Sequence, residues 1–209
     1  YAVVRAFGRT HATALMISAS LAQIGEFSFI LAGLALALGL LPAEGRDLIA
    51  QAPTGSGKTA AFGLGLLQRM DPAQLRVQAL VLCPTRELAD QVTLEIRRLA
   101  RADDNVKVLT LCGGTPIRNQ LTSLEHGAHV VVGTPGRILD HLERGSLALA
   151  SLQTLVLDEA DRMLDMGFFD DIAAVVRQCP ARRQTLLFSA TYPEGIATLS
   201  SRFLREPKE

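Results

Sequence analysis

Short apolar runs alternate with charged, amphipathic segments over most of the chain. Each run is rich in Val and Leu, and the segments between them have helical spacing, as in RELADQVTLEIRRLAR at residues 86–101. Continuous apolar strands separated by amphipathic helices are typical of a parallel sheet that helices cover on both faces. The runs occupy residues 48–52, 77–85, 106–112, 128–134, 152–160 and 184–191. We therefore predict an α/β fold whose ligands bind at the carboxyl ends of the strands.

The first part of the chain is a long, nearly uncharged apolar run. Residues 12–41 read ATALMISASLAQIGEFSFILAGLALALGLL, in which Glu26 is the one charged residue. This run exceeds the roughly 20 residues that cross a bilayer, and its small residues are typical of packed membrane helices. It is too long for the apolar core of a signal peptide, whereas a buried helix of a soluble protein stays open, because apolar runs alone do not separate the two cases. We expect residues 12–38 to be largely helical and not to complete the sheet; within a bilayer, Glu26 would be a functional group.

Length, charge and cysteine content limit the number of domains, the kind of partner and the cellular compartment only in part. A chain of 209 residues is long enough for one sizeable domain. The 21 Lys and Arg residues balance 21 Asp and Glu residues, so a surface that binds a polyanion must be a local patch. Cys83, Cys112 and Cys179 lie far apart, which favours free thiols in a reducing compartment and a cytoplasmic location. Membrane association through residues 12–41 is the alternative. The chain begins with Tyr1 and not with Met, as a fragment would.

The stretch QAPTGSGKTA at residues 51–60 lies between a predicted strand and a predicted helix. Gly55 and Gly57 let the backbone turn so that its amides converge on phosphate oxygens, and the helix N-terminus adds partial positive charge. Lys58 would reach the β and γ phosphates, and the Thr59 hydroxyl would ligate magnesium. The sequence therefore predicts a site for a nucleotide with Mg²⁺, made by Thr54, Gly55, Ser56, Gly57, Lys58 and Thr59.

A second stretch, LVLDEAD at residues 155–161, supplies acidic groups at the end of an apolar strand. A phosphate loop needs one carboxylate for the metal and another to orient the attacking water. Asp158 follows the apolar residues without a turn, so we predict that it binds the magnesium and that Glu159 orients the water. Together with Lys58 they form the predicted catalytic set. Asp161 and Asp165 fit an acidic, solvated helix cap.

These stretches resemble the first-domain motifs of the DEAD-box RNA helicases, in the order of that family. The motifs are APTGSGKT, PTRELA at residues 84–89, Gly113–Gly114, TPGR at residues 134–137, DEAD at residues 158–161 and SAT at residues 189–191. The flanking text is similar to the bacterial DbpA-like branch, which acts on ribosomal RNA. The resemblance implies a RecA-like domain over residues 46–209 that binds ATP and Mg²⁺ and couples ATP hydrolysis to RNA binding and duplex unwinding.

The resemblance also assigns residues outside the phosphate loop. It implies contacts with the RNA sugar-phosphate backbone by Arg86, Gly114, Thr134 and Arg137, and a link between hydrolysis and strand separation by Ser189 and Thr191. Backbone amides, hydroxyls and guanidinium groups at loop tips grip the phosphates of single-stranded RNA without reading its bases.

Two parts of the family pattern are missing from the sequence. The family carries an adenine-reading glutamine after a Thr-Pro-like turn before the phosphate loop, but here the one glutamine earlier than Gln51, which directly adjoins the loop, is Gln23, inside the apolar run. The second RecA-like domain, which supplies arginine fingers and half of the RNA cleft in the family, is not found before the chain ends at Glu209. We therefore expect a helicase that is weak or inactive as this chain alone.

Residues 20–49 resemble a different family, the Kef-type monovalent cation:proton antiporters. The letters GRDLI at residues 45–49 fit either family, which makes them the natural seam of a chimera. The predicted division is then an antiporter-like apolar segment at 1–45 and a helicase domain at 46–209. A membrane segment or antiporter fragment that carries a nucleotide-binding module is the second functional hypothesis.

The remaining polar and aromatic residues carry weaker signals. The four histidines show no metal-ligand spacing, and we expect His129, beside VVVG, to be packed or exposed and not catalytic. Phe168 and Phe169 are expected to pack in the core or against another domain, with base stacking as the alternative.

Overall fold

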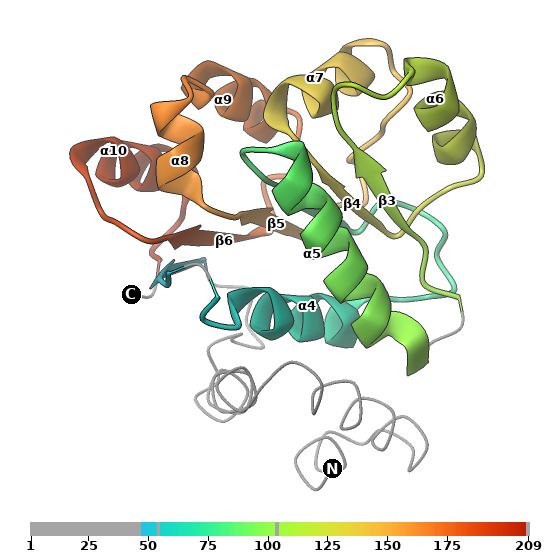
Figure 1. Ribbon diagram of the computed structural model, residues 1–209, viewed down its shortest axis with the longest axis horizontal. Coiled ribbons are helices and arrows are strands. Elements are labelled where there is room, and N and C mark those ends of the chain that lie inside the picture. Colours follow the sequence, from blue (N-terminus) through green and yellow to red (C-terminus); the bar gives the residue numbers. More distant parts are fainter. Residues whose placement is uncertain (1–46, 54, 103–104, 208–209) are drawn as a thin grey trace, which may run out of the picture.

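The centre of the structure is a parallel sheet of six strands (Figure 1). The computed structural model describes residues 47–53, 55–102 and 105–207. Along the sheet the strands are β1 (Leu48–Gln51), β6 (Gln184–Ser189), β5 (Thr154–Leu157), β2 (Ala79–Leu82), β4 (Val130–Gly133) and β3 (Val108–Leu111). Every pair of neighbours is parallel. The α/β fold with a parallel sheet, predicted from the apolar runs, is confirmed.

Helices cover both faces of the sheet. On one face lie α4 (Lys58–Arg69) and α5 (Arg86–Leu99), which is continued by a short 3-10 helix, Ala100–Ala102 (Figure 1). On the other face lie α7 (Pro135–Glu143), α8 (Ala160–Asp165), α9 (Phe169–Arg177) and α10 (Glu194–Phe203). The remaining helix, α6 (Ile117–Glu125), lies beside the edge strand β3 (Figure 1). This two-sided cover is the reason why the strands read as continuous apolar runs.

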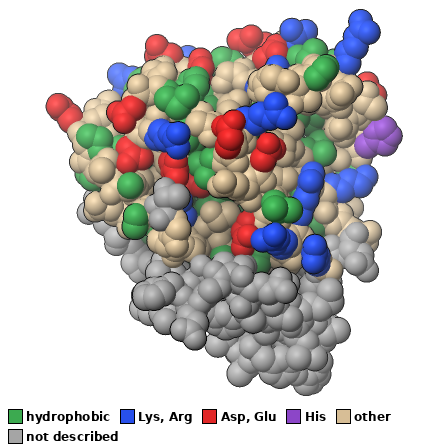
Figure 2. All heavy atoms as spheres, viewed as in Figure 1, with side chains coloured by type: hydrophobic (Ala, Val, Ile, Leu, Met, Phe, Trp, Pro, Cys, Tyr) green, Lys and Arg blue, Asp and Glu red, His purple; other side chains and the backbone are tan. Residues whose placement is uncertain are grey.

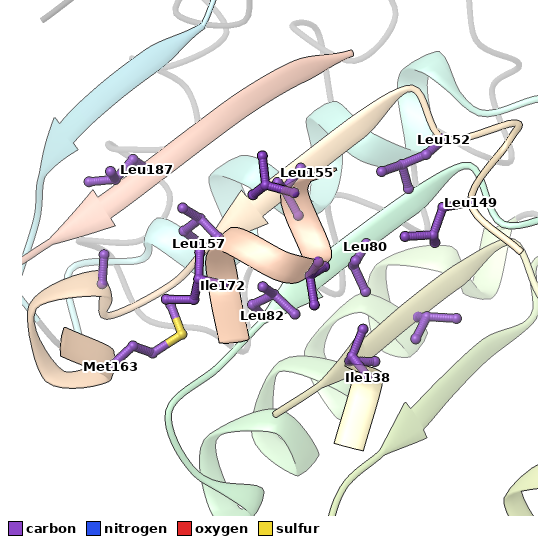
Figure 3. Close-up of a cluster of buried hydrophobic side chains, with 14 of the residues drawn as sticks. Leu80, Leu82, Ile138, Leu149, Leu152, Leu155, Leu157, Met163, Ile172 and Leu187 are labelled. Atoms are coloured by element: carbon purple, nitrogen blue, oxygen red, sulfur yellow. The ribbon is translucent and has the colours of Figure 1, made fainter. Parts of the chain in front are cut away.

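Alternate residues of each strand enter two separate cores. Leu80 and Leu82 face α7 to α10, whereas Ala79 and Val81 face α4 and α5. Figure 3 shows the first core, in which Leu80, Leu82, Leu155 and Leu157 converge with Ile138 and Ile172 of the covering helices. A leucine side chain that is fully buried stabilises the fold by about 1.5–3 kcal/mol. The two cores therefore hold the strand ends in a fixed register.

The start of β1 is tied to the far end of the described chain by a buried aspartate. Asp47 accepts hydrogen bonds from the backbone N–H of Thr185 at 2.6 Å and of Arg205 at 2.5 Å. A buried carboxylate needs such partners, because an unpaired charge is costly away from water. Three residues of the predicted seam, Asp47 to Ile49, thus belong to the sheet domain.

Several predictions fall on residues that the structure does not describe. They are the helix at 12–38, the apolar run at 12–41 with Glu26, Gln23, and the division at residue 45; they stay predictions. Within the part of the chain that is described, no helix combines the length and apolar character needed to cross a bilayer.

Candidate functional site

The predicted nucleotide residues meet at the carboxyl ends of three neighbouring strands. The phosphate loop follows β1, Asp158 and Glu159 follow β5, and Ser189 ends β6, which lies between β1 and β5. The backbone N–H of Ala52 donates to the Ser189 carbonyl at 2.9 Å, so the loop leaves the sheet beside β6. Segments that are far apart in the sequence are therefore brought together, as expected for open α/β sheets.

The phosphate loop has the backbone shape that its glycines were predicted to allow. Gly55 and Gly57 have φ angles of 82° and 81°, in the left-handed region that favours glycine. Gly57 precedes α4, and among the described residues no side-chain hydrogen bond caps the start of that helix. Unsatisfied N–H groups at a helix N-terminus form an anion site. Thr54 of the predicted loop lies outside the described residues.

Lys58 is buried against both carboxylates of the predicted catalytic set. Its Nζ lies 2.9 Å from Asp158 Oδ1 and 3.7 Å from Glu159 Oε1. The Asp158 side chain is 0% exposed. Burial raises the pKa of Asp158 above its ordinary value, and the ion pair with Lys58 opposes that rise in part. The three groups form a compact, water-poor charge cluster at the mouth of the phosphate loop.

Glu159 has an unusual backbone conformation. Its φ and ψ are 52° and 54°, which is rare for a residue other than glycine and stores about 1–3 kcal/mol of strain. One carboxylate oxygen faces Lys58, and the other lies 3.4 Å from Nη1 of Arg162. Such strain persists only where the surroundings fix the residue, and it clusters at functional sites.

The site fits a magnesium ion held jointly with phosphates. Among the described residues, Asp158 Oδ2 and Ser56 Oγ are buried and have no hydrogen-bond partner. Thr59 lines, with Lys58 and Glu159, a pocket of about 350 Å³. In the described ranges there is no group of three His, Cys, Asp or Glu side chains that could cage a metal. One or two oxygen ligands beside bound phosphates is the arrangement that Mg²⁺ commonly uses in nucleotide sites.

The predicted RNA residues occupy the other half of the same sheet edge. Arg86 follows β2, Gly114 follows β3, and Thr134 and Arg137 follow β4, which lies between those two strands. Gly114 has a φ of 77°, and a Cβ at this position would lie 3.2 Å from Arg86 Nη1. Arg86 is exposed and makes only a loose 3.6 Å contact with Asp90. Its guanidinium is therefore available to a ligand.

Thr134 is placed by a close approach of two strands. A Cβ on the preceding Gly133 would lie 2.3 Å from the backbone oxygen of Leu111, so only glycine fits between β3 and β4 here. Pro135 opens α7 directly after Thr134, a position that favours proline. Arg137 donates from Nη1 to the Thr115 carbonyl at 3.1 Å, which links the ends of β3 and β4.

Asp161 does more than the solvated helix cap that its sequence fits. It lies half-exposed in the first turn of α8, and its Oδ2 accepts hydrogen bonds from the backbone N–H and the hydroxyl of Thr191, at 2.9 and 2.8 Å. Partial burial acts to raise the pKa of Asp161, but the hydrogen bonds from Thr191 and Arg162 outweigh it and hold the pKa below its ordinary value. Asp161 thus joins the segment after β5 to the segment after β6. Asp165, by contrast, is exposed as expected.

Sequence reasoning also missed the residues that brace the site from behind. Gln51 donates to the Ala190 carbonyl at 3.1 Å, and Gln120 contacts Arg137 at 2.9 Å. No motif marks either glutamine, because each acts on a segment distant in the sequence.

Other residues are packed, as predicted. His129 is buried, with Nδ1 accepting from the Lys107 N–H at 2.9 Å. Phe169 packs against Phe203 at a ring distance of 6.1 Å and joins the edge of the first core, as does Phe168. On the face shown in Figure 2, basic and acidic side chains are interspersed, in keeping with the balanced charge of the chain.

Comparisons with known proteins agree with this geometry. A family model described as DEAD/DEAH box helicase matches residues 35–199. The ATP-dependent RNA helicase DbpA of Escherichia coli (strain K12) is 63% identical over 169 residues, which cover 80% of this chain and 37% of that protein. The helicase CshA of Listeria monocytogenes is 53% identical over 165 residues, which cover 79% of this chain and 32% of that protein.

A solved structure of a DEAD box protein also matches the fold. A DEAD box protein from the hyperthermophile Methanococcus jannaschii matches with a TM-score of 0.75 and 42% identity, over 78% of this chain and 44% of that one. The chain therefore spans less than half the length of these relatives. The resemblance of residues 20–49 to antiporters finds no support in these comparisons.

Proposed function

The chain belongs to the DEAD/DEAH box helicase family, and on that premise we propose that its sheet domain is the nucleotide-hydrolysing domain of an RNA helicase. The observation that carries the proposal is the buried contact of 2.9 Å between Lys58 and Asp158, next to a phosphate loop with left-handed glycines. A buried ion pair is by itself weak evidence for a stabilising role, since the cost of removing both charges from water offsets their attraction. Its position at the mouth of an anion site favours a role in binding ATP.

The roles of the nucleotide residues follow from their placement. The N–H groups around Gly55 and Gly57 receive phosphate oxygens, and Lys58 turns from the carboxylates toward the β and γ phosphates. Thr59 and Asp158 hold Mg²⁺, which when bound neutralises charge on the phosphates. Glu159, which its surroundings hold in a left-handed backbone conformation, orients the attacking water. Each of these roles is a proposal that the geometry supports.

The RNA residues would act on the sugar-phosphate backbone. Arg86 and Arg137 present guanidinium groups, and Gly114 and Thr134 present backbone and hydroxyl groups, at neighbouring strand ends. Contacts of this kind position an RNA strand without reading its bases. Single-stranded RNA, and ribosomal RNA in particular because of the similarity to DbpA, is the proposed partner.

Ser189 and Thr191 are proposed to report the state of the nucleotide. Ser189 ends the strand that lies between the phosphate loop and Asp158, and Thr191 is bonded to Asp161. A shift of the acidic segment on hydrolysis would therefore be passed to the residues after β6. A cytoplasmic location stays a prediction, and no observation on the described residues favours the antiporter hypothesis.

The test is phosphate release from ATP, with and without single-stranded RNA. The family resemblance places stabilising arginines in a second domain, and an arginine of this kind is worth about 10³–10⁵ in rate. We expect slow turnover, nearly indifferent to RNA, from the 209-residue chain. Fusion to the remaining part of the E. coli relative should restore stimulation by RNA.

Two variants sharpen this test. Glu159→Gln in the fused protein should abolish the gain while ATP stays bound, because the amide no longer orients the water as a base. Glu143→Gln, the same change at an exposed residue at the end of α7, is the matched control. A fused protein that binds no ATP, or that RNA does not stimulate, would contradict the proposed function. Brisk stimulated turnover by the chain alone would show that our account of the missing arginines is wrong.

A further inference from the structure

A buried glutamine on α6 uses both ends of its amide group. Gln120 donates from Nε2 to the Cys112 carbonyl at 2.9 Å. Its Oε1 accepts from Arg137 Nη1 and pairs with His141 Nε2, each at 2.9 Å. The side chain is only 6% exposed, so these bonds form away from water, where leaving a partner unsatisfied is costly.

The partners of Gln120 belong to two different RNA-binding segments. Cys112 directly precedes Gly113 and Gly114 at the end of β3, whereas Arg137 lies in the first turn of α7, after Thr134. One amide group therefore spans the ends of two adjacent strands. No motif of the sequence joins Gln120 to either segment.

The acceptor side of the amide is held in place from behind. His141 is fully buried and its Nδ1 lies 2.9 Å from the hydroxyl of Ser146. Ser146 in turn donates to the backbone oxygen of His141 at 3.0 Å. Ile138, on the same helix, is anchored in the first core (Figure 3). The helix that carries Arg137 is thus fixed by packing on one side and by the amide of Gln120 on the other.

Arg137 keeps hydrogen-bonding capacity for a ligand. Its Nη1 donates to Thr115 and Gln120, and its Nε lies 3.9 Å from Asp140. Among the described residues no hydrogen bond uses Nη2. A guanidinium group has several donors in a planar fork that matches a phosphate. Because Nη1 is already hydrogen-bonded, the guanidinium group is fixed and Nη2 points in a constant direction. Binding then costs less side-chain entropy than it would for a free arginine.

We propose that Gln120 is a positioning residue for RNA binding: it fixes the Arg137 guanidinium against the end of β3, so that both RNA-binding segments meet the same stretch of RNA backbone. The proposal rests on the proposed function, in that Arg137 is taken to contact RNA. Gln120 itself touches no RNA in this account and acts on RNA only through Arg137, which it holds against the end of β3 by its bond to the Cys112 carbonyl.

The first experiment replaces the amide by an apolar side chain of similar size. Gln120→Leu, or Gln120→Met should the leucine variant fail to fold, removes the bonds to Arg137, His141 and Cys112. In the variant the Arg137 side chain is no longer held by Gln120 and must be immobilised when RNA binds. The affinity for a fluorescently labelled single-stranded RNA should therefore fall roughly 2- to 12-fold. Fluorescence anisotropy at low salt measures it, and ATP affinity should not change.

The chain offers a matched control in Gln78. This glutamine is also buried and also makes three hydrogen bonds, to the backbone of Asp71 and Gln74, but it precedes β2 at the opposite end of the strands. Gln78→Leu should lower the denaturation midpoint as Gln120→Leu does and leave RNA affinity unchanged. Equal losses of RNA affinity in the two variants would overturn the proposal, because they would reflect general destabilisation.

A double-mutant cycle separates positioning from a merely structural role. If Gln120 acts through Arg137, Gln120→Leu should have no further effect on RNA affinity in an Arg137→Ala background. Additive losses would overturn the proposal. Loss of the Arg137 contact should also reduce the slope of log affinity against log salt by about 1. A chain that binds no RNA, or binds it equally well after Arg137→Ala, overturns the proposed RNA role itself; a loss with Arg137→Ala but none with Gln120→Leu overturns only the role of Gln120.

Discussion

Substitution of Asp158 by asparagine tests the metal site most directly. The change keeps the shape of the side chain and removes its charge. In the structure, Oδ1 pairs with Lys58 at 2.9 Å and Oδ2 has no partner among the described residues. We expect the folded protein to tolerate Asp158→Asn, because burial already disfavours the charged carboxylate and Lys58 keeps its contact with Glu159 at 3.7 Å. The effect should appear when nucleotide and metal are added.

The expected magnitude follows from the bond that is weakened. Interactions of a charged group with its hydrogen-bond partner contribute about 1.5–3 kcal/mol, which corresponds to about 10- to 160-fold in affinity. The dissociation constant of a fluorescent ATP analogue is measured with Mg²⁺ and with a chelator, for the parent chain and the variant. In the parent chain Mg²⁺ should tighten binding. In Asp158→Asn this gain should shrink by the factor given, while binding without Mg²⁺ should be equal or tighter, since a negative charge near the phosphates is gone.

The control is Asp165→Asn, the same chemical change at an exposed residue at the end of α8. It should leave the Mg²⁺ dependence intact. If Asp158→Asn keeps the full gain from Mg²⁺, the carboxylate does not hold the metal, and the unpartnered oxygen has been misinterpreted. Equal weakening with and without Mg²⁺ would also refute the reasoning, because it would show that the variant disturbs the phosphate loop itself.

Two further predictions concern the base and the pH. No adenine-reading glutamine precedes the phosphate loop in the expected context, so dissociation constants for ATP and GTP, measured by competition, should differ by less than about tenfold, or roughly 1.4 kcal/mol; a hundredfold preference for ATP would mean that another group reads adenine. Burial lowers the pKa of His129 below its ordinary value, so the unfolded chain binds the proton more tightly and the free energy of unfolding should fall as pH drops below about 6.5. Urea denaturation between pH 5 and 8 checks this, with His129→Gln as the variant that reduces the dependence, since the pKa of buried His141 is lowered by burial too; a parent profile that falls no more steeply than that of the variant would contradict it.

Much of the sheet could be predicted because its signals are local. A strand buried on both faces must be apolar throughout, and each of the six runs contains one strand. The run at 152–160 is longer than β5, since Asp158 and Glu159 leave the sheet to form the acidic segment and Ala160 already begins α8. The phosphate loop could also be predicted, because its left-handed backbone favours glycine and the sequence has Gly55 and Gly57 at those positions.

The residues that brace the site could not be predicted in this way. Asp47 bonds the N–H of Thr185, Asp161 bonds Thr191, and Gln120 bonds Arg137, all across long separations in the chain. A hydrogen bond between distant segments leaves no periodicity in the sequence and depends on the register of the folded sheet. For the same reason the sequence shows Asp161 only as a cap at the start of α8 and does not show its bond to Thr191.

The order of the strands bears on how nucleotide and RNA could be coupled. The proposed nucleotide residues follow β1, β6 and β5, the proposed RNA residues follow β2, β4 and β3, and the two halves meet where β5 pairs with β2. At this boundary the N–H of Asp158 donates to the Leu82 carbonyl at 3.0 Å, and the next residue, Cys83, is a buried thiol. Packed strands of this kind do not deform continuously. Coupling requires an element with two arrangements that both ligands bias. The segment after β6 is exposed at Thr191 and is bonded both to Asp161 and, through the Ala190 carbonyl, to Gln51 beside the phosphate loop, so we expect it to respond to the nucleotide. We therefore expect the sheet of the chain alone to respond weakly to RNA, because it is rigid and because the resemblance places the stabilising arginines in a second domain.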